Sequence, residues 1–287
     1  RNASTNHDLF DSVRGALKQL ASNNNELEAT VSSSLKSFDS DGFTVGTNSN
    51  LNASGGTYSA LCWKETADAG FDIVTATGTG SAKTIAHSLS AVPHWIISKE
   101  KSGSANDWTI YHHKNTSAPE TDSLILNENN ATADNSTHWN DTAPTSSVFS
   151  VGSGSVVNRT DSTYVYYLFS EKQGFSKFGK YTGNGNADGA FIYLGFKPAW
   201  FLCKNTQDTG DNWILHDNTR DPFNVTDAGT APNTSAVEFT DVDMDFLSNG
   251  VKMRNNTGRA NSAKTFIYMA FAESPFVNSN GVPTNAR

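Results

Sequence analysis

The chain repeats one stretch of sequence, and this repeat limits what the chain can fold into. Residues 93–113 read PHWIISKEKSGSANDWTIYHH, and residues 198–217 read PAWFLCKNTQDTGDNWILHD. Each copy has a proline, a tryptophan in an apolar run, a polar turn, and a second tryptophan in another apolar run. Two strand-like runs joined by a turn rich in Gly, Asn and Asp predict a β-hairpin. The chain therefore contains at least two copies of one β unit.

A second motif follows the hairpins and occurs three times, beginning at Phe38, Val148 and Phe246. Each copy leads through a polar loop to an apolar segment that closes on a glutamate: YSALCWKE (58–65), YVYYLFSE (164–171) and FIYMAFAE (266–273). Trp63, Phe169 and Phe271 occupy equivalent places in these segments. The copies lie about 105 residues apart, which is the period of a domain rather than of a solenoid repeat.

The repeated hairpin and the threefold motif divide the chain into units. We expect a partial first unit at 1–66, β-sandwich units at 67–173 and 174–276, and a C-terminal tail at 277–287. The segment from Leu9 to Arg14 matches Ile214–Arg220, so the first unit lacks its front hairpin. Because residue 1 is also Arg rather than Met, we expect the chain to be processed or to begin inside a longer protein.

Composition supports an all-β fold. Charged residues make up 17% of the chain and aromatic residues 11%, against about 25% charged residues in ordinary soluble proteins. Many small polar residues and scattered aromatics are typical of short strands joined by turns. The prediction is an all-β chain of tandem β-sandwich or jelly-roll-like units. Leu9, Val13 and Leu20 have near-helical spacing and predict one short N-terminal helical segment within residues 8–20.

Charge and hydropathy exclude two classes of partner. The net charge is −8 and Lys and Arg do not cluster, which argues against binding to nucleic acid. No apolar run approaches the roughly 18 residues of a membrane span, so we expect no membrane insertion. Cys62 and Cys203 both lie in apolar runs, and we interpret them as buried free thiols in preference to a disulfide.

No segment predicts a metal or a cofactor. His112 and His113 are adjacent, so they point to opposite faces of a strand, and the remaining candidates have no recognisable metal spacing: His87, His94 and His138. Residues 241–245 (DVDMD) resemble the start of a calcium loop, but Phe246 stands where an EF-hand needs glycine. A solvated acidic turn is the default there, with another kind of calcium loop as the alternative. Residues 183–189 are interpreted as a flexible turn rather than a phosphate cradle.

Catalytic residues are not predicted either. Glu65, Glu171 and Glu273 could form a glycosidase pair, but each closes the same strand-like segment in a different unit. A residue repeated once per unit is better explained by one structural role, such as accepting hydrogen bonds from a neighbouring loop. We expect the chain not to be an enzyme.

One tryptophan stands apart from the others. Trp95, Trp108, Trp200 and Trp213 recur in register and are predicted core residues. Trp139 lies in the polar stretch NSTHWNDT, next to His138 and Asn140. This composition suits a glycan-contact surface made by these three residues. It also suits a loop anchored by one buried ring, which is the favoured interpretation.

Several motifs resemble a repeated β-domain family of tail and fibre structural proteins from marine bacteriophages. The motifs occur in the family's order over most of residues 8–276: FDSDGF (38–43), WNDTAPTSSVF (139–149), GFSKF (174–178), YTGNG (181–185), FLSNG (246–250) and YMAFAE (268–273). The resemblance implies a structural protein on the virion surface and supplies no catalytic residues.

The functional expectation is therefore a bacteriophage tail fibre or appendage that presents β-sandwich modules for contact with host-surface glycans. The expected partners are further copies of the chain, plausibly in a trimer, and other virion proteins. A capsid decoration or head-fibre protein is the alternative, and a polysaccharide-degrading tail enzyme is less favoured.

Overall fold

The computed structural model describes residues 3–277 and 283–284, and strands dominate them. The predicted all-β class is confirmed. Helices among these residues are single turns: α1 (Ser49–Asn52), α2 (Ser136–Trp139), α3 (Ser155–Asn158), α4 (Gly258–Asn261), η1 (Ala67–Ala69) and η2 (Pro119–Thr121). Most of the predicted tail at 277–287 lies outside the described residues. Strand β22 (Phe276–Val277) pairs antiparallel with β23 (Pro283–Thr284).

Residues 67–173, called unit 2, form two sheets. The larger sheet has the order β11-β10-β9-β8-β13-β6. Its strands are β6 (Phe71–Thr77), β8 (Trp95–Ser102), β9 (Thr109–His112), β10 (Asp122–Ile125), β11 (Ala133–Asp134) and β13 (Thr163–Phe169). The smaller sheet pairs β7 (Lys83–Ala86) with β12 (Val148–Val151). One apolar cluster joins the two sheets in a sandwich-like arrangement, with the ring of Phe149 in β12 packed at a tilt against that of Tyr166 in β13.

Residues 174–276, called unit 3, repeat this arrangement. The larger sheet has the order β14-β21-β16-β17-β18 and the smaller sheet has the order β15-β20-β19. The strands are β14 (Ser176–Thr182), β15 (Phe191–Tyr193), β16 (Pro198–Asn205), β17 (Ile214–Asp217), β18 (Gly229–Thr230), β19 (Met244–Leu247), β20 (Gly250–Met253) and β21 (Thr265–Ala272). Both predicted hairpins are confirmed, since β8 pairs with β9 and β16 pairs with β17. Their four tryptophans are buried, as predicted.

Residues 1–66, called unit 1, hold two small sheets. Strand β2 (Lys18–Ala21) pairs with β1 (Asp8–Leu9) and β3 (Ala29–Thr30), and β4 (Leu35–Phe38) pairs with β5 (Phe43–Val45). The helix predicted within residues 8–20 is therefore wrong.

Local chemistry explains why this segment forms a hairpin instead of a helix. The carboxylate of Asp11 accepts a hydrogen bond from the backbone N–H of Arg14 and binds the Arg14 guanidinium, which also donates to the carbonyl of Lys18. Gly15 has φ +102°, a conformation that glycine adopts readily and that ends any helix. Leu9 then lies opposite Leu20, and both contact the central core.

The segment 58–65 corresponds to β13 and β21 but is not a strand in the structure. Its Cys62 is exposed, which corrects the prediction of a buried thiol, whereas Cys203 is buried and both are free. The strands that flank β13 are β6 and β8, and unit 1 contains no counterpart of them among the described residues.

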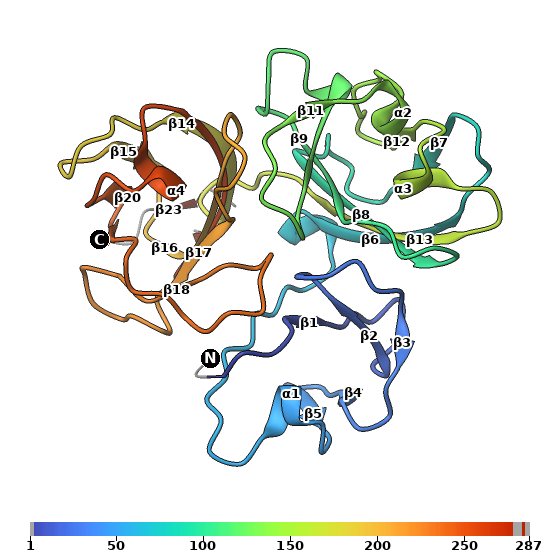
Figure 1. The fold of residues 1–287 in the computed structure, drawn as a ribbon, viewed down its shortest axis with the longest axis horizontal. Coiled ribbons are helices and arrows are strands. Elements are labelled where there is room, and N and C mark those ends of the chain that lie inside the picture. The colour runs from blue at the N-terminus through green and yellow to red at the C-terminus, as the bar shows by residue number, and fades with distance from the viewer. Residues whose placement is uncertain (1–2, 278–282, 285–287) are drawn as a thin grey trace.

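The three units lie around a common centre, where each contributes one face (Figure 1). A single apolar cluster joins them, built from the four hairpin tryptophans, Leu20, Leu124, Val165, Phe178 and others. Trp63 and Phe271 have ring centroids 5.6 Å apart, and those of Phe169 and Phe271 are 6.2 Å apart. Trp63, Phe169 and Phe271, which the sequence predicts to be equivalent, therefore meet at the common centre of the three units. This cluster explains why the larger sheets are apolar on both faces.

Units 1 and 2 meet through the same contacts as units 2 and 3. The indole Nε1 of Trp108 donates to the carbonyl of Ala21, and that of Trp213 donates to the carbonyl of Ile125. Ala21 and Ile125 are equivalent, since the preceding leucines pair with Leu9 and Ile110. Two backbone hydrogen bonds repeat in the same way: Glu28 N–H to Lys101 O, and Thr132 N–H to Thr206 O.

Candidate functional site

The described part of the chain contains no group of three or more His, Cys, Asp or Glu that could hold a metal ion. His112 is buried in β9, and the neighbouring His113 contacts the ring of His94 at 4.4 Å between centroids. Burial lowers the pKa of His113 to about 4, so it is neutral at ordinary pH. This histidine pair joins units 2 and 3, because His113 Nε2 lies 2.9 Å from the carbonyl of Phe178.

Two aspartates of the acidic run at 241–245 form ion pairs with arginines. Asp245 pairs with Arg254, and Asp241 pairs with Arg259. Two of its three carboxylates are therefore already bound to cations, which favours the interpretation as an acidic turn over a calcium loop.

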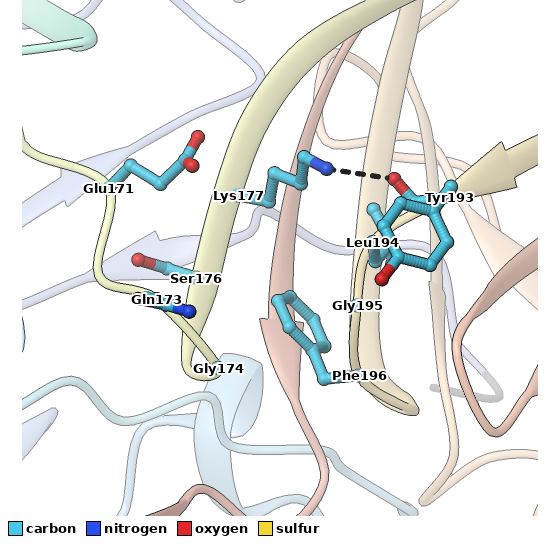
Figure 2. A pocket seen from close by; sticks show the side chains of 9 residues that line it. All are labelled: Glu171, Gln173, Gly174, Ser176, Lys177, Tyr193, Leu194, Gly195 and Phe196. Carbon is cyan, nitrogen blue, oxygen red and sulfur yellow. Dashed lines mark hydrogen bonds between the residues drawn. The ribbon is translucent and has the colours of Figure 1, made fainter. Parts of the chain in front are cut away.

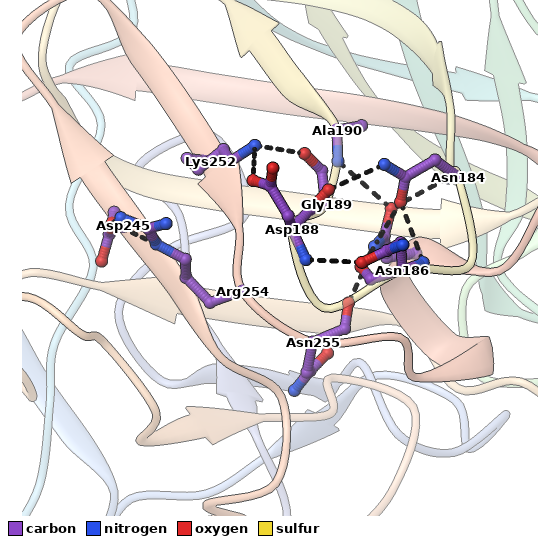
Figure 3. A network of polar contacts seen from close by, with 10 residues as sticks. Asn184, Asn186, Asp188, Gly189, Ala190, Asp245, Lys252, Arg254 and Asn255 are labelled. Carbon is purple, nitrogen blue, oxygen red and sulfur yellow. Dashed lines mark hydrogen bonds and ion pairs between the residues drawn. The ribbon is translucent and has the colours of Figure 1, made fainter.

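The glycine-rich loop at 183–189 is fixed by buried asparagine chemistry rather than open to an anion (Figure 3). The Asn261 side-chain oxygen accepts from the backbone N–H groups of Asn184 and Ala190, and its amide nitrogen donates to Asn186 O. Asp188 at the tip pairs with Lys252 at 2.6 Å. These backbone donors are already bonded and are therefore not free to bind a phosphate. The same bonds fix the loop, whereas the sequence predicted a flexible turn.

The three closing glutamates accept hydrogen bonds, each from a different partner. Glu65 accepts from the Ser12 hydroxyl, Glu171 from the Phe178 backbone N–H, and Glu273 from the Asn218 amide. Lys197 also pairs with Glu273 at 3.0 Å, and these contacts lower the pKa of that carboxyl. The glutamates thus hold neighbouring segments, as their repetition predicts.

Two of the three residues predicted to contact glycans are buried. Trp139 is 2% exposed and packs against Tyr111, and His138 is also buried. The His138 ring is bonded on both nitrogens, to Ser123 and Asn135, and burial lowers its pKa to about 4.

Asn140 is exposed and ends helix α2 with φ +55°. Because a buried ring cannot stack on a sugar, the structure corrects the glycan-contact assignment of Trp139 and His138. It supports the alternative of a loop anchored by one buried tryptophan.

A cleft of about 350 Å³ at the junction of units 2 and 3 is the candidate ligand site (Figure 2). One wall is the loop after β13, with Glu171 and Gln173, and the floor is the start of β14, with Ser176 and Lys177. The other wall is residues 193–196, which follow β15.

Tyr193 and Lys177 contact each other at the edge of this cleft. The Tyr193 side chain is 58% exposed, and the Lys177 ammonium lies 5.1 Å from the centre of its ring. The same ammonium donates to the Tyr193 carbonyl at 3.0 Å, as Figure 2 shows. A hydrogen bond and a cation–π contact thus hold the ring in one orientation beside the cleft.

The cleft can bind a polar ring but offers no catalytic pair. An exposed aromatic face accepts the apolar face of a sugar, while the carboxylate, the amide and the ammonium around it can bond hydroxyl groups. Glu171 is the one carboxylate among the lining residues. Hydrolysis of a glycosidic bond ordinarily needs two.

A smaller cleft of about 210 Å³ lies next along the chain, lined in part by Lys197, Asn218 and Phe223. Phe223 is 82% exposed. Both clefts therefore combine an exposed aromatic ring with a lysine.

Tyr193 was not predicted as a site residue from the sequence. In Phe191-Ile192-Tyr193 the middle side chain is buried and the outer two are 46% and 58% exposed. Alternation along a strand of the smaller sheet thus places two aromatic rings on the outer face. A short strand of three residues gives too little alternation to be recognised before the sheet is known.

Comparison with known proteins gives one family. A model described as "Domain of unknown function (DUF7483)" matches residues 1–275. No curated protein and no solved structure matches the chain. None of the helices among the described residues is long and apolar enough to cross a membrane.

Proposed function

The chain belongs to the DUF7483 family of domains of unknown function, and we propose that it is a non-enzymatic structural protein of a bacteriophage virion. In this role it is a tail fibre or appendage whose β-sandwich modules contact saccharides on the host surface. The motif resemblance, the repetition of one β unit and the two clefts beside exposed aromatic rings support the proposal.

The observation that carries the saccharide role is the exposed Tyr193 ring over the cleft. The Tyr193 ring is 58% exposed and is held beside the cleft by Lys177, so it is already oriented for stacking on the apolar face of a sugar. Glu171 and Gln173 supply acceptors and donors on the opposite wall. This combination suits the ring and hydroxyl groups of a sugar residue.

A binding experiment tests the saccharide role. Fragments of bacterial surface polysaccharide are titrated into the wild type and into Tyr193→Ala, with binding followed by calorimetry. We expect about tenfold weaker binding in the variant, which corresponds to about 1.4 kcal/mol.

Phe191→Ala is the matched control, because Phe191 lies on the same strand and is 46% exposed but does not line the cleft. Equal binding by the wild type and Tyr193→Ala would refute the cleft as the contact surface. Gold-labelled antibody against the chain, viewed on intact particles, tests the location. Label on the tail supports the fibre assignment, and label on the capsid contradicts it.

A further inference from the structure

Glu171 and Glu273 follow the equivalent strands β13 and β21, but only Glu273 has a cation beside it. Lys197 lies 3.0 Å from the carboxylate of Glu273, and the Asn218 amide donates to the same carboxylate at 2.8 Å. Among the described residues, Glu171 forms no ion pair. Its Oε2 accepts from the backbone N–H of Phe178, at 3.4 Å. The cleft therefore contains a carboxylate that no cation of the described chain pairs with.

The sequence explains why unit 2 lacks this cation. Residues 89–93 (LSAVP) correspond to residues 194–198 (LGFKP), and the second residue of each has a positive φ, +52° and +86° respectively. In this correspondence Val92 takes the place of Lys197. Because a valine side chain carries no charge, Glu171 lacks the ion pair that the equivalent glutamate of unit 3 makes.

Contacts across the junction of units 2 and 3 fix the position of Glu171. Its backbone N–H donates to Nδ1 of His94 at 3.0 Å, and its Oε2 accepts from Phe178 of β14. A histidine nitrogen that accepts a hydrogen bond is unprotonated, and burial also lowers the pKa of His94. His94 is therefore neutral and supplies no positive charge. The residue Glu171 is exposed, and its Oε1 has no hydrogen-bond partner within the described part of the chain.

Tyr193 stands on the wall of the cleft opposite Glu171, as Figure 2 shows. Lys177 is the one cation among the lining residues, and Tyr193 already engages it through its carbonyl and its ring. A sugar ring stacked on Tyr193 thus has a carboxylate across the cleft from it, in a volume of about 350 Å³. One residue of a saccharide can meet both groups in a space of this size.

We propose that the cleft prefers a saccharide residue that bears an ammonium group, an amino sugar without an N-acetyl group. This inference rests on the proposed saccharide role and adds the chemical class of the sugar. The ring stacks on Tyr193, and the ammonium donates a charge-assisted hydrogen bond to Oε1 of Glu171. A neutral sugar binds without this bond. An acidic sugar is repelled by Glu171 and by the net charge of −8 on the chain.

Three trisaccharides with the same β-1,4-linked backbone test the preference, because they differ only at carbon 2 of each ring. The chitosan trimer carries an amine there, the chitin trimer an acetamide and cellotriose a hydroxyl group. Calorimetric titration in mildly acidic buffer keeps the amine protonated. We expect the wild type to bind the chitosan trimer about fivefold more tightly than cellotriose, which corresponds to about 1 kcal/mol. Added salt should reduce this ratio.

Two variants separate the cleft from the general attraction between a cationic sugar and an acidic chain. Glu171→Gln keeps an oxygen that can accept from Phe178 but removes the charge, so the ratio of the two affinities should fall to about one. Glu273→Gln is the matched control. It removes the same charge from the equivalent position, where Lys197 already pairs with the carboxylate, and it should keep the ratio of the wild type.

Each contrary outcome has a separate meaning. Equal binding of the three trisaccharides that disappears in Tyr193→Ala would overturn the preference for an amino sugar and leave the saccharide role standing. An equal ratio in Glu171→Gln and Glu273→Gln would also overturn it, because net charge would then explain the preference. If neither the trisaccharides nor fragments of bacterial surface polysaccharide bind, the saccharide role itself is refuted.

Discussion

Trp108 and Trp213 make the same hydrogen bond at two different interfaces of the ring of units. Each indole nitrogen donates to a main-chain carbonyl of the preceding unit, Trp108 to Ala21 at 3.0 Å and Trp213 to Ile125 at 2.9 Å. Both rings are 0% exposed. One interface is thus used twice, and the two tryptophans join the β strands of neighbouring units into a single core.

Replacing either tryptophan by phenylalanine should weaken the fold. Trp213→Phe leaves the carbonyl of Ile125 without this buried donor, which costs about 1–3 kcal/mol of unfolding free energy. Urea unfolding measures the loss. Trp63→Phe is the control, because the counterparts Phe169 and Phe271 show that phenylalanine fits this place. An equal loss of unfolding free energy in Trp213→Phe and Trp63→Phe would contradict the role of this hydrogen bond.

Asn261 should be among the most sensitive polar positions. Its side chain is 0% exposed and bonds Asn184, Ala190, Asn186 and Asn255. Asn261→Ala removes all of these hydrogen bonds at once, and at about 1 kcal/mol for each bond we expect a loss of about 3 kcal/mol in chemical unfolding.

The equivalent residue of unit 1 provides the control for this variant. Asn52 is exposed and donates to Gly46 O, so Asn52→Ala should cost at most about 1 kcal/mol. A similar loss in both variants would contradict the role assigned to burial.

Stability should fall in mild acid. Burial lowers the pKa of His138 to about 4 and that of His216 to about 3, and it lowers the pKa of His112 as well. In the unfolded chain these groups take up protons near pH 6.5, while the folded chain does not. The stabilisation is present above pH 6.5 and is lost as the pH falls toward 4, by about 1.4 kcal/mol per pH unit for each histidine.

Unfolding free energy measured at several pH values between 7 and 4 tests this dependence. The variant His138→Gln removes one titrating group, so its slope with pH should be shallower by about 1.4 kcal/mol per pH unit than that of the wild type. An unchanged slope would show that His138 does not contribute.

Polysaccharide incubated with the chain should keep its length. The cleft beside Tyr193 presents Glu171 as its lone carboxylate, and cleavage ordinarily requires a pair. Size-exclusion chromatography of the polysaccharide should give the same profile with the wild type and with Glu171→Gln. Shortening by the wild type that disappears in Glu171→Gln would establish an enzyme instead.

The repeat made much of the fold predictable. Tryptophans in register predicted both hairpins, because a pattern that occurs twice is unlikely to arise from local chance. The helix predicted within residues 8–20 failed because apolar spacing does not reveal the Asp11–Arg14 pair, which closes a turn at Gly15. Cys62 was misplaced because segment 58–65 has the sequence of a core strand but forms no strand in the structure.

The candidate site was less accessible to sequence reasoning. Trp139 lies among polar residues, which suggested a glycan-contact surface. In the structure a single-turn helix directs its ring into the core. Tyr193 lies in an unremarkable apolar run, and only the pairing of β15 with β20 decides which side chains face outward. Exposure of an aromatic ring depends on its sheet neighbours, which a single short run does not encode.

The arrangement of three units in one chain has a genetic consequence. In a symmetric trimer of identical subunits, any substitution appears three times at once. Here each unit is encoded separately, so a surface residue of one unit can be substituted without the same substitution appearing in the other two. Tyr193 and Phe223, which are exposed on unit 3, can therefore vary independently of the core residues that all three units contribute to the centre.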